Sequence, residues 1–349
     1  MFQTASGLPE TTKESWYLLP MTQPRFWLGI IISVAALIWA MHGIPLAEIW
    51  HSLRHVSYVT LLPISLLTLM DLWGKGARWE VILGNVPNLR RIQCFSIISI
   101  GYLVNNLFPL RAGDFVRALL LGKKTGAGTA RVLPSILIER TLDLISILLL
   151  LAGTLPSLPS LPSNLRRGVR VLATVLPSVI IAVVMLTSSS RFRYTLVGIL
   201  QRWRFLKAKT GVVKKIESAF EGFAPLRSPW AICKALGWSF SSWLCVTMLA
   251  YAMFFPFGIR LPFSAAVLVV CMTSLGAAIP SSPGFVGVYH SLVVLALGAY
   301  FVERGQAMSY ALVLHGWQYA LQSLLGGISL WAENVSYSEM GRLGAEGKA

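Results

Sequence analysis

A single stretch, residues 101–121, constrains this chain more than any other. Its sequence, GYLVNNLFPLRAGDFVRALLL, is apolar enough for a membrane, but Pro109 and Gly113 interrupt a continuous helix. It also carries amide and charged side chains: Asn105, Asn106, Arg111, Asp114 and Arg117. In hydrocarbon, broken backbone and charge persist only where protein or a wet cavity surrounds them. The stretch therefore predicts a helix, a break and a second helix inside a membrane protein.

The composition agrees with a membrane protein. Hydrophobic residues make up 55% of the 349 residues and charged residues 13%, whereas soluble domains carry about 25% charged residues. The net charge of +16 would suggest nucleic acid in a soluble protein. Here we attribute it to cytoplasmic loops and anionic lipid, and we expect no nucleic-acid partner. The four cysteines form no CxxC pair, so we expect no metal and no cofactor.

Apolar runs predict about six full transmembrane helices beside two broken segments. The six lie near residues 26–41, 57–73, 132–153, 169–187, 230–256 and 308–331. Runs of this length cross or nearly cross a hydrocarbon core of about 30 Å. Residues 190–229 carry nine Lys or Arg against two Glu, which places this loop in the cytoplasm. We therefore expect a multi-pass protein of the cell membrane with both termini cytoplasmic.

Charges also fall inside the third predicted span. Glu139 and Asp143 lie four residues apart on one helical face, and Arg140 can pair with Asp143 three residues on. Ionisable residues this far into a span are costly unless they are paired or wetted. Such groups mark a functional site by default. The alternative is a buried ion network that only fixes helix packing.

The end of the second predicted span carries a further charged group. Asp71 and Lys75 are one helical turn apart and can pair, and Arg78 and Glu80 follow. These side chains either snorkel to the cytoplasmic surface or contribute to a polar cavity. We favour snorkelling, because they lie where the helix approaches the interface.

A second break of similar design interrupts the apolar segment 262–302. There Pro280, Ser281, Ser282, Pro283 and Gly284 separate two apolar runs. The resumed helix offers a free N-terminus, whose amides and dipole suit an anion. His290, nearly two turns into that helix, is explained equally well as a satisfied buried histidine or as a site residue.

The two breaks indicate an internal repeat. Both read P-x-x-x-G, and their first prolines, Pro109 and Pro280, are 171 positions apart. Each half holds three full crossings and one broken element, so the second half must enter inverted, as in many transporters. We predict an all-α polytopic membrane protein with six full helices and two broken or re-entrant hairpins in an inverted repeat. Its parts are an arm (1–24), the first repeat (25–153), an outer loop with the fourth span (154–188), the basic loop (189–228), the rest of the second repeat (229–333) and a tail (334–349).

Three segments, NNLFPLRAGDFVRA, IERTLD and PSSPGFVGVYHS, resemble the signatures of the lysylphosphatidylglycerol synthase transmembrane-region family. The resemblance covers nearly the whole chain. That family includes the flippase half of bacterial multiple peptide resistance factors, which move aminoacylated phosphatidylglycerol between leaflets. Other relatives are linked to polyprenyl-phosphate sugar lipids. By resemblance, the motif positions are Asn105, Pro109, Arg111, Gly113, Asp114, Arg117, Glu139, Arg140, Asp143, Pro283, Gly284 and Gly287.

Two departures from the family pattern affect what it implies. The position of His290 is often glutamate in the family, so a histidine there indicates a different headgroup or a proton-sensitive site. We also expect no soluble synthase domain after the membrane region, since none follows it in this sequence. We therefore expect that this chain does not itself make aminoacyl lipids.

These observations predict a lipid transporter, a flippase or scramblase for an anionic or phosphate-bearing lipid. We expect Arg111, Arg117 and Arg140 to bind phosphate, because a guanidinium is always charged and can bind it in a fork. The carboxylates Asp114, Glu139 and Asp143 would hold those arginines when the site is empty, or carry a coupling proton. The predicted substrate site is completed by Asn105, Asn106, Ser281, Ser282, Gly284 and His290.

Two other functions remain open. The first is an intramembrane lipid-modifying enzyme using Glu139, Asp143 or His290, although no phosphate-binding glycine loop or nucleophile motif supports it. The second is a scaffold without transport activity that binds a lipid synthase. Broken, charged helices are a costly design for a scaffold, so we prefer the transporter. A synthase or glycosyltransferase partner remains compatible with it.

Overall fold

The chain is described by a computed structural model in which every described element is helical. The described residues are 24–44, 58–84, 89–108, 111–157, 228–277 and 281–334, with isolated positions between 47 and 54, at 86, between 167 and 178, and at 222. The predicted fourth span, the basic loop, the N-terminal arm and the C-terminal tail therefore lie almost wholly outside the described residues.

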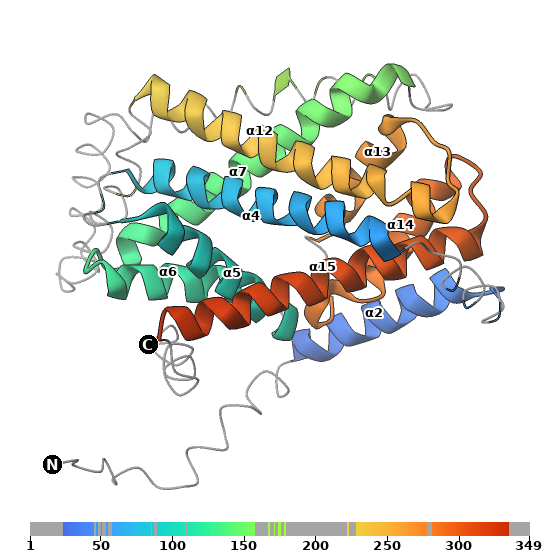
Figure 1. Cartoon of the computed structure of the whole chain (residues 1–349), viewed down its shortest axis with the longest axis horizontal. Coiled ribbons are helices and arrows are strands. Elements are labelled where there is room, and N and C mark those ends of the chain that lie inside the picture. Colours follow the sequence, from blue (N-terminus) through green and yellow to red (C-terminus); the bar gives the residue numbers. More distant parts are fainter. Residues whose placement is uncertain are drawn as a thin grey trace, which may run out of the picture.

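Long helices build the described bundle and run along its length (Figure 1). They are α2 (Pro24–Met41), α4 (Leu61–Leu83), α7 (Thr129–Thr154), α12 (Pro229–Ala252) and α15 (Arg304–Ala332). The last four run about 35–44 Å at 1.5 Å per residue, which exceeds a hydrocarbon core of about 30 Å. These five helices confirm the helical segments predicted for the first, second, third, fifth and sixth spans.

Length and hydropathy together identify one helix of the described part, Pro229–Phe257, as fit to cross a membrane, with a mean hydropathy of 1.5. Shorter apolar helices occur at Ile30–Met41, Phe263–Gly276 and Pro283–Gly298. The helices α4 and α7 are similar in length to α12, but each carries a group of charged residues in its interior.

The first predicted break is confirmed as a helical hairpin. Helix α5 (Arg91–Leu107) ends at Leu107, and α6 (Ala112–Lys124) begins five residues later. At about 26 and 20 Å, these helices are too short to cross a core of about 30 Å. The hairpin starts where α4 ends and returns to where α7 begins, so both of its ends lie at the same end of the bundle (Figure 1).

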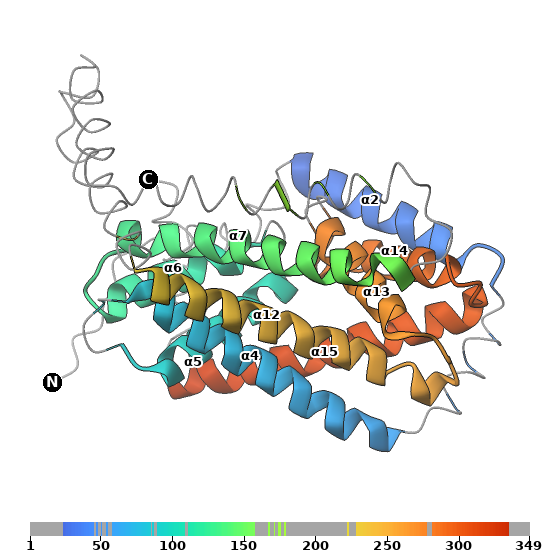
Figure 2. The same cartoon turned by 90° about the horizontal axis from the view of Figure 1, so that it is seen from above.

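The second predicted break is confirmed as well. Helix α13 (Phe263–Gly276) and α14 (Val288–Gly298) are separated by a short turn, Pro283–Phe285, in which Gly284 is left-handed at φ 67°. This hairpin lies at the opposite end of the bundle from α5 and α6 in both views (Figures 1 and 2). The two hairpins therefore point toward each other, and the Pro283–Phe285 turn packs against α5.

Close backbone packing holds the first hairpin shut. A Cβ added to Gly113 would lie 1.9 Å from the carbonyl oxygen of Gly101, so only glycine permits α6 to approach α5 this closely. The backbone N–H of Gly113 donates to Oδ1 of Asn105 at 2.8 Å. Arg111, just before α6, adopts the left-handed conformation at φ 54°. These contacts fix the start of α6, which carries two of the charged residues of the site.

Candidate functional site

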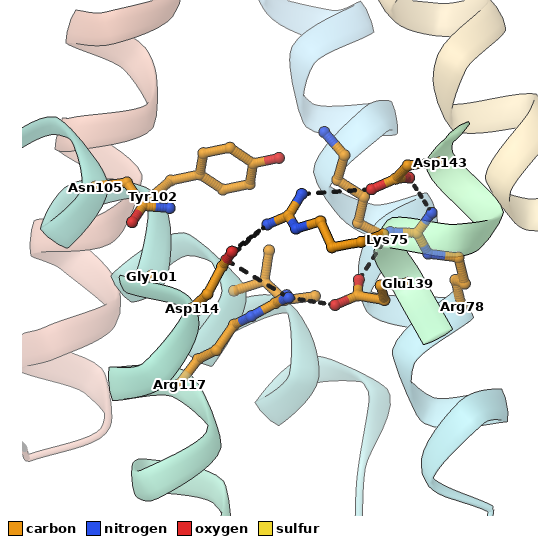
Figure 3. A pocket seen from close by; sticks show the side chains of 11 residues that line it. Lys75, Arg78, Gly101, Tyr102, Asn105, Asp114, Arg117, Glu139 and Asp143 are labelled. Carbon is orange, nitrogen blue, oxygen red and sulfur yellow. Dashed lines mark hydrogen bonds and ion pairs between the residues drawn. The ribbon is translucent and has the colours of Figure 1, made fainter. Parts of the chain in front are cut away.

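A small polar cavity lies among α4, α5, α6 and α7. Charged side chains dominate its lining: Lys75, Arg78, Asp114, Arg117, Glu139, Arg140 and Asp143. The volume in which a water-sized molecule can be centred is about 20 Å³, enough for about one water. Figure 3 shows Asp114 and Arg117 approaching from one side and Arg78 from the other, with Glu139 and Asp143 between them. The cavity is therefore filled by its own ion pairs.

Arg78 lies at the centre of this network and is 1% exposed. Its Nη1 donates to Oδ1 of Asp143 at 2.5 Å and to Oγ of Ser239 on α12 at 2.8 Å. Its Nη2 donates to Oε1 of Glu139 at 2.8 Å. One guanidinium from α4 thus joins two carboxylates of α7 and a hydroxyl of α12. Charges buried this deeply are tolerated only when paired in this way.

Arg117 brings the first hairpin into the same network. Its Nη2 forms an ion pair with Oε2 of Glu139 and lies 3.7 Å from Oδ1 of Asp114. Its guanidinium lies 5.1 Å from the ring centroid of Trp79, a cation–π contact. Trp79 is itself held by a hydrogen bond from its Nε1 to Oγ of Ser135. Glu139 therefore bridges Arg78 of α4 and Arg117 of α6.

Arg140 is the most accessible guanidinium of the cavity lining, with 40% of its side chain exposed. Its Nη2 donates to both carboxylate oxygens of Asp114, at 2.7 and 2.6 Å. Its Nη1 contacts Oδ2 of Asp143 at 3.5 Å, which confirms the predicted pairing within α7. Asp143 also accepts a hydrogen bond from Nε1 of Trp243. Arg140 thus lies where the network meets the outside.

A second ion pair extends the network along α4. Lys75 donates to Oδ2 of Asp71 at 2.7 Å, as the sequence predicted, and Ser242 of α12 donates to the other oxygen of Asp71. The ammonium of Lys75 also lies 5.0 Å from the ring centroid of Tyr102 on α5. With Asp71 included, four basic side chains face four acidic ones, so the network is formally neutral.

The neutral network still contains unused donors. Among the described residues, the Nε–H groups of Arg78, Arg117 and Arg140 are buried and have no hydrogen-bond acceptor. Buried donors almost always find a partner, because leaving one unpaired costs about 1–3 kcal/mol. Three such donors around one cavity indicate that the arrangement is not fully satisfied by the carboxylates alone.

Half of the predicted substrate-binding residues come together in this cavity. They are Asn105, Asp114, Arg117, Glu139, Arg140 and Asp143. Asn105 serves mainly to hold the start of α6 through Gly113. Arg111 lies at the tip of the first hairpin, where it is exposed and does not line the cavity. It is close enough to Arg140 and Asp114 for their charges to act on it.

Four of the other predicted residues belong to the second hairpin instead: Ser281, Ser282, Gly284 and His290. The backbone N–H of Ser282 donates to Oγ of Ser33 on α2 at 2.8 Å, and Oγ of Ser282 donates to the carbonyl of Val286. His290 accepts a hydrogen bond at Nδ1 from the backbone N–H of Gly287. The predicted free N-terminus of this helix is thus partly capped by its own histidine. The remaining predicted residues, Asn106, Ser281 and Gly284, do not line the cavity.

Sequence reasoning missed Lys75, Arg78 and Tyr102 as cavity residues. The preferred interpretation of Lys75 and Arg78 as snorkelling side chains is wrong, because Arg78 is fully buried and both line the cavity. A usable signal was present. Asp71, Lys75 and Arg78 follow the spacing i, i+4, i+7, which puts all three on one face of α4. A charged stripe on one helical face indicates a shared polar neighbour.

Comparisons with known proteins find a family of membrane proteins. The model of the lysylphosphatidylglycerol synthase TM region family matches residues 26–326. Two proteins of Methanothermobacter thermautotrophicus, each described as a UPF0104 membrane protein, are similar to the chain. One is 24% identical over 76% of this chain and 83% of its own length, and the other is 24% identical over 75% and 78%. No solved structure matches the chain significantly.

Proposed function

The chain belongs to the lysylphosphatidylglycerol synthase transmembrane-region family of membrane proteins, and on that premise we propose that it moves a phosphate-bearing lipid between leaflets as a flippase or scramblase. The observation that carries this proposal is the convergence of Arg78, Arg117 and Arg140 on one cavity inside a helical bundle. Ionisable groups at such positions are expensive and mark substrate or ion pathways by default.

Guanidinium chemistry favours phosphate as the bound group. An Arg fork matches the two oxygens of a carboxylate or a phosphate equally well. In the structure, Nη2 of Arg140 donates to both oxygens of Asp114, while its Nη1 contacts Asp143. A lipid phosphate can take the place of that carboxylate without a change in the geometry of the arginine. Because Arg140 is partly exposed, it is the group that a headgroup would meet first.

The closed cavity gives the carboxylates a second role. With room for about one water, the site admits a headgroup only if Asp114 or Asp143 moves away from Arg140. The carboxylates therefore act as internal substitutes for the lipid phosphate while the site is empty. When the phosphate arrives, the unpaired Nε–H groups of the arginines supply additional donors for its remaining oxygens.

The two hairpins supply a route for alternating access. They enter from opposite ends of the bundle (Figures 1 and 2), which is the arrangement that an inverted repeat would produce. We interpret the chain as two such halves, with six full crossings in total. Movement of the first hairpin would carry Asp114 and Arg117 away from α7 and open the cavity. Movement of one half against the other would then expose the lipid to each leaflet in turn.

We expect Arg140→Gln to slow lipid movement strongly. The change removes the charge of the accessible guanidinium and leaves Arg78 and Arg117 paired with Glu139. Hydrogen bonds to charged groups contribute about 1.5–3 kcal/mol, so the transport rate should fall by about 10- to 100-fold. The measurement is the movement of fluorescent phosphatidylglycerol between leaflets of liposomes that contain the purified protein. Lipid that co-purifies with the protein is identified in parallel by mass spectrometry.

Arg260→Gln is the matched control, because Arg260 is exposed and does not line the cavity. It should leave both the rate and the retained lipid unchanged. Unaltered transport by Arg140→Gln, in protein that remains folded, would contradict the proposal. A new lipid species that forms during the assay would instead indicate an enzyme acting at the same cavity.

A further inference from the structure

Helix α15 passes beside the tips of both hairpins, and one side chain of this helix contacts both of them. The hydroxyl of Tyr319 donates to the backbone carbonyl of Asn106 at 3.0 Å. Asn106 is the second-last residue of α5, where helical carbonyls have no partner of their own. The helix breaks after Leu107, so the carbonyl of Asn106 has no helical donor. The hydroxyl of Tyr319 supplies that donor.

The ring of Tyr319 packs against the second tip. A Cβ added to Gly284 would lie 2.6 Å from Cε2 of Tyr319 and 3.5 Å from the carbonyl oxygen of Asn106. Gly284 is left-handed at φ 67°, so glycine satisfies both the backbone conformation and the close approach of the ring. The two tips thus meet at Tyr319, with the backbone of each tip in contact with it.

A second contact ties the first tip to the same helix. Nδ2 of Asn106 donates to Oγ of Ser323 at 3.0 Å and approaches the carbonyl of Tyr319 at 3.4 Å. Tyr319 and Ser323 are four residues apart and share one face of α15. These interactions lie outside the charged cavity, and neither the phosphate chemistry nor the ion network requires them.

We propose that Tyr319 is a positioning residue that holds the two hairpin tips together and is released when either hairpin moves. The transport consequence rests on the proposed function, whereas the contact between the tips does not. Its hydroxyl bonds to one tip while its ring covers the other. Any movement of α5 relative to the Pro283–Phe285 turn must break the hydroxyl bond or pull the ring from Gly284.

The test measures the separation of the tips directly. Leu107 and Val286 flank them and are 47% and 42% exposed, so each can be replaced by cysteine and spin-labelled. The partly or fully exposed cysteines Cys233 and Cys245 are first changed to Ala. We expect Tyr319→Phe, which keeps the ring, to raise the population at longer distances by about fivefold, the typical worth of one hydrogen bond. Double electron–electron resonance gives the distance distribution in reconstituted protein.

Tyr310→Phe provides a matched control on the same helix. Its hydroxyl also donates to a backbone carbonyl, that of Ala250 at 2.8 Å, but this bond leads to α12 and not to a hairpin tip. It should leave the distance distribution unchanged. A distribution that is the same in Tyr319→Phe and the parent protein would overturn the proposal, as would an equal shift in Tyr310→Phe.

Transport and lipid retention separate this proposal from the proposed function. We expect Tyr319→Phe to retain as much co-purified phosphate lipid as the parent, since the cavity is untouched, while its rate of fluorescent phosphatidylglycerol movement changes severalfold. If Tyr319→Phe lengthens the distance between the labels but neither the parent nor any variant moves lipid, the positioning role is supported and the proposed transport function is contradicted. Lipid movement that is sensitive to Arg140→Gln but equal in Tyr319→Phe and the parent, with unchanged distances, contradicts the positioning role alone.

Discussion

Replacing Arg78 by Met is expected to produce the largest loss of stability among single substitutions in the cavity. The change leaves Glu139 and Asp143 buried without the guanidinium that contacts both of them. Removal of one partner from a buried ion pair costs about 3–5 kcal/mol, because the remaining charge keeps its desolvation penalty. The free energy of unfolding, measured by SDS titration in mixed micelles, should fall by that amount.

Two further variants test whether the loss of stability comes from the unpaired charges. The double variant Arg78→Met with Asp143→Asn keeps the network neutral, because Glu139 still pairs with Arg117 and Asp114 with Arg140, and it should recover most of the loss. Arg260→Met, at an exposed position outside the cavity, should have little effect. If Arg78→Met alone unfolds at the same SDS concentration as the parent, the ion network contributes nothing to the fold.

Gly113→Ala is the second substitution with a large expected effect. The added methyl would lie 1.9 Å from the carbonyl oxygen of Gly101 and 2.8 Å from Oδ1 of Asn105. The first of these atoms belongs to helical backbone and cannot rotate away, so α6 must shift relative to α5. Overpacking costs about 1–3 kcal/mol, and we expect the upper end of this range. Since α6 carries Asp114 and Arg117, lipid movement should be lost as well.

Gly237→Ala is the corresponding control, because Gly237 lies in α12 and no atom lies within 4 Å of an added Cβ. At this position alanine should raise the melting temperature slightly, since glycine in a helix interior costs about 1 kcal/mol of stability relative to alanine. Thermal unfolding in detergent and the fluorescent lipid assay compare the two variants. Equal melting temperatures for them would show that the hairpin tolerates the wider spacing.

The breaks in both hairpins were predictable because their causes are local. Pro109 limits where a helix can continue, and the sequence from Pro280 to Gly284 does the same for the second hairpin. Gly113 was predicted to be part of the break but lies inside α6, where it permits the close approach to α5. The pairs Asp71–Lys75 and Arg140–Asp143 were predictable for the same reason, since each is set by helical spacing.

The partners of Arg78 could not be predicted in this way. Its carboxylates are 61 and 65 positions away in the sequence, so only the packing of α4 against α7 brings them together. The second hairpin shows a different limit of prediction from sequence, because suitable residue types there do not form a binding site. Ser282 and His290 are chemically suited to an anion, but the fold uses both to satisfy nearby backbone groups. Residue type indicated which side chains can bind an anion, whereas tertiary packing decided which of them form hydrogen bonds to the backbone instead.

The equal numbers of basic and acidic side chains in the cavity network have an electrical consequence. A conformational change that carries a neutral group part of the way across a membrane does no work against the transmembrane voltage. Each unbalanced elementary charge, in contrast, is worth about 2.3 kcal/mol per 100 mV. For a transporter built on this network, the return of the empty protein is electrically silent. The voltage then acts only on the step in which an anionic lipid is bound, so the cell's membrane potential would set the preferred direction of that lipid.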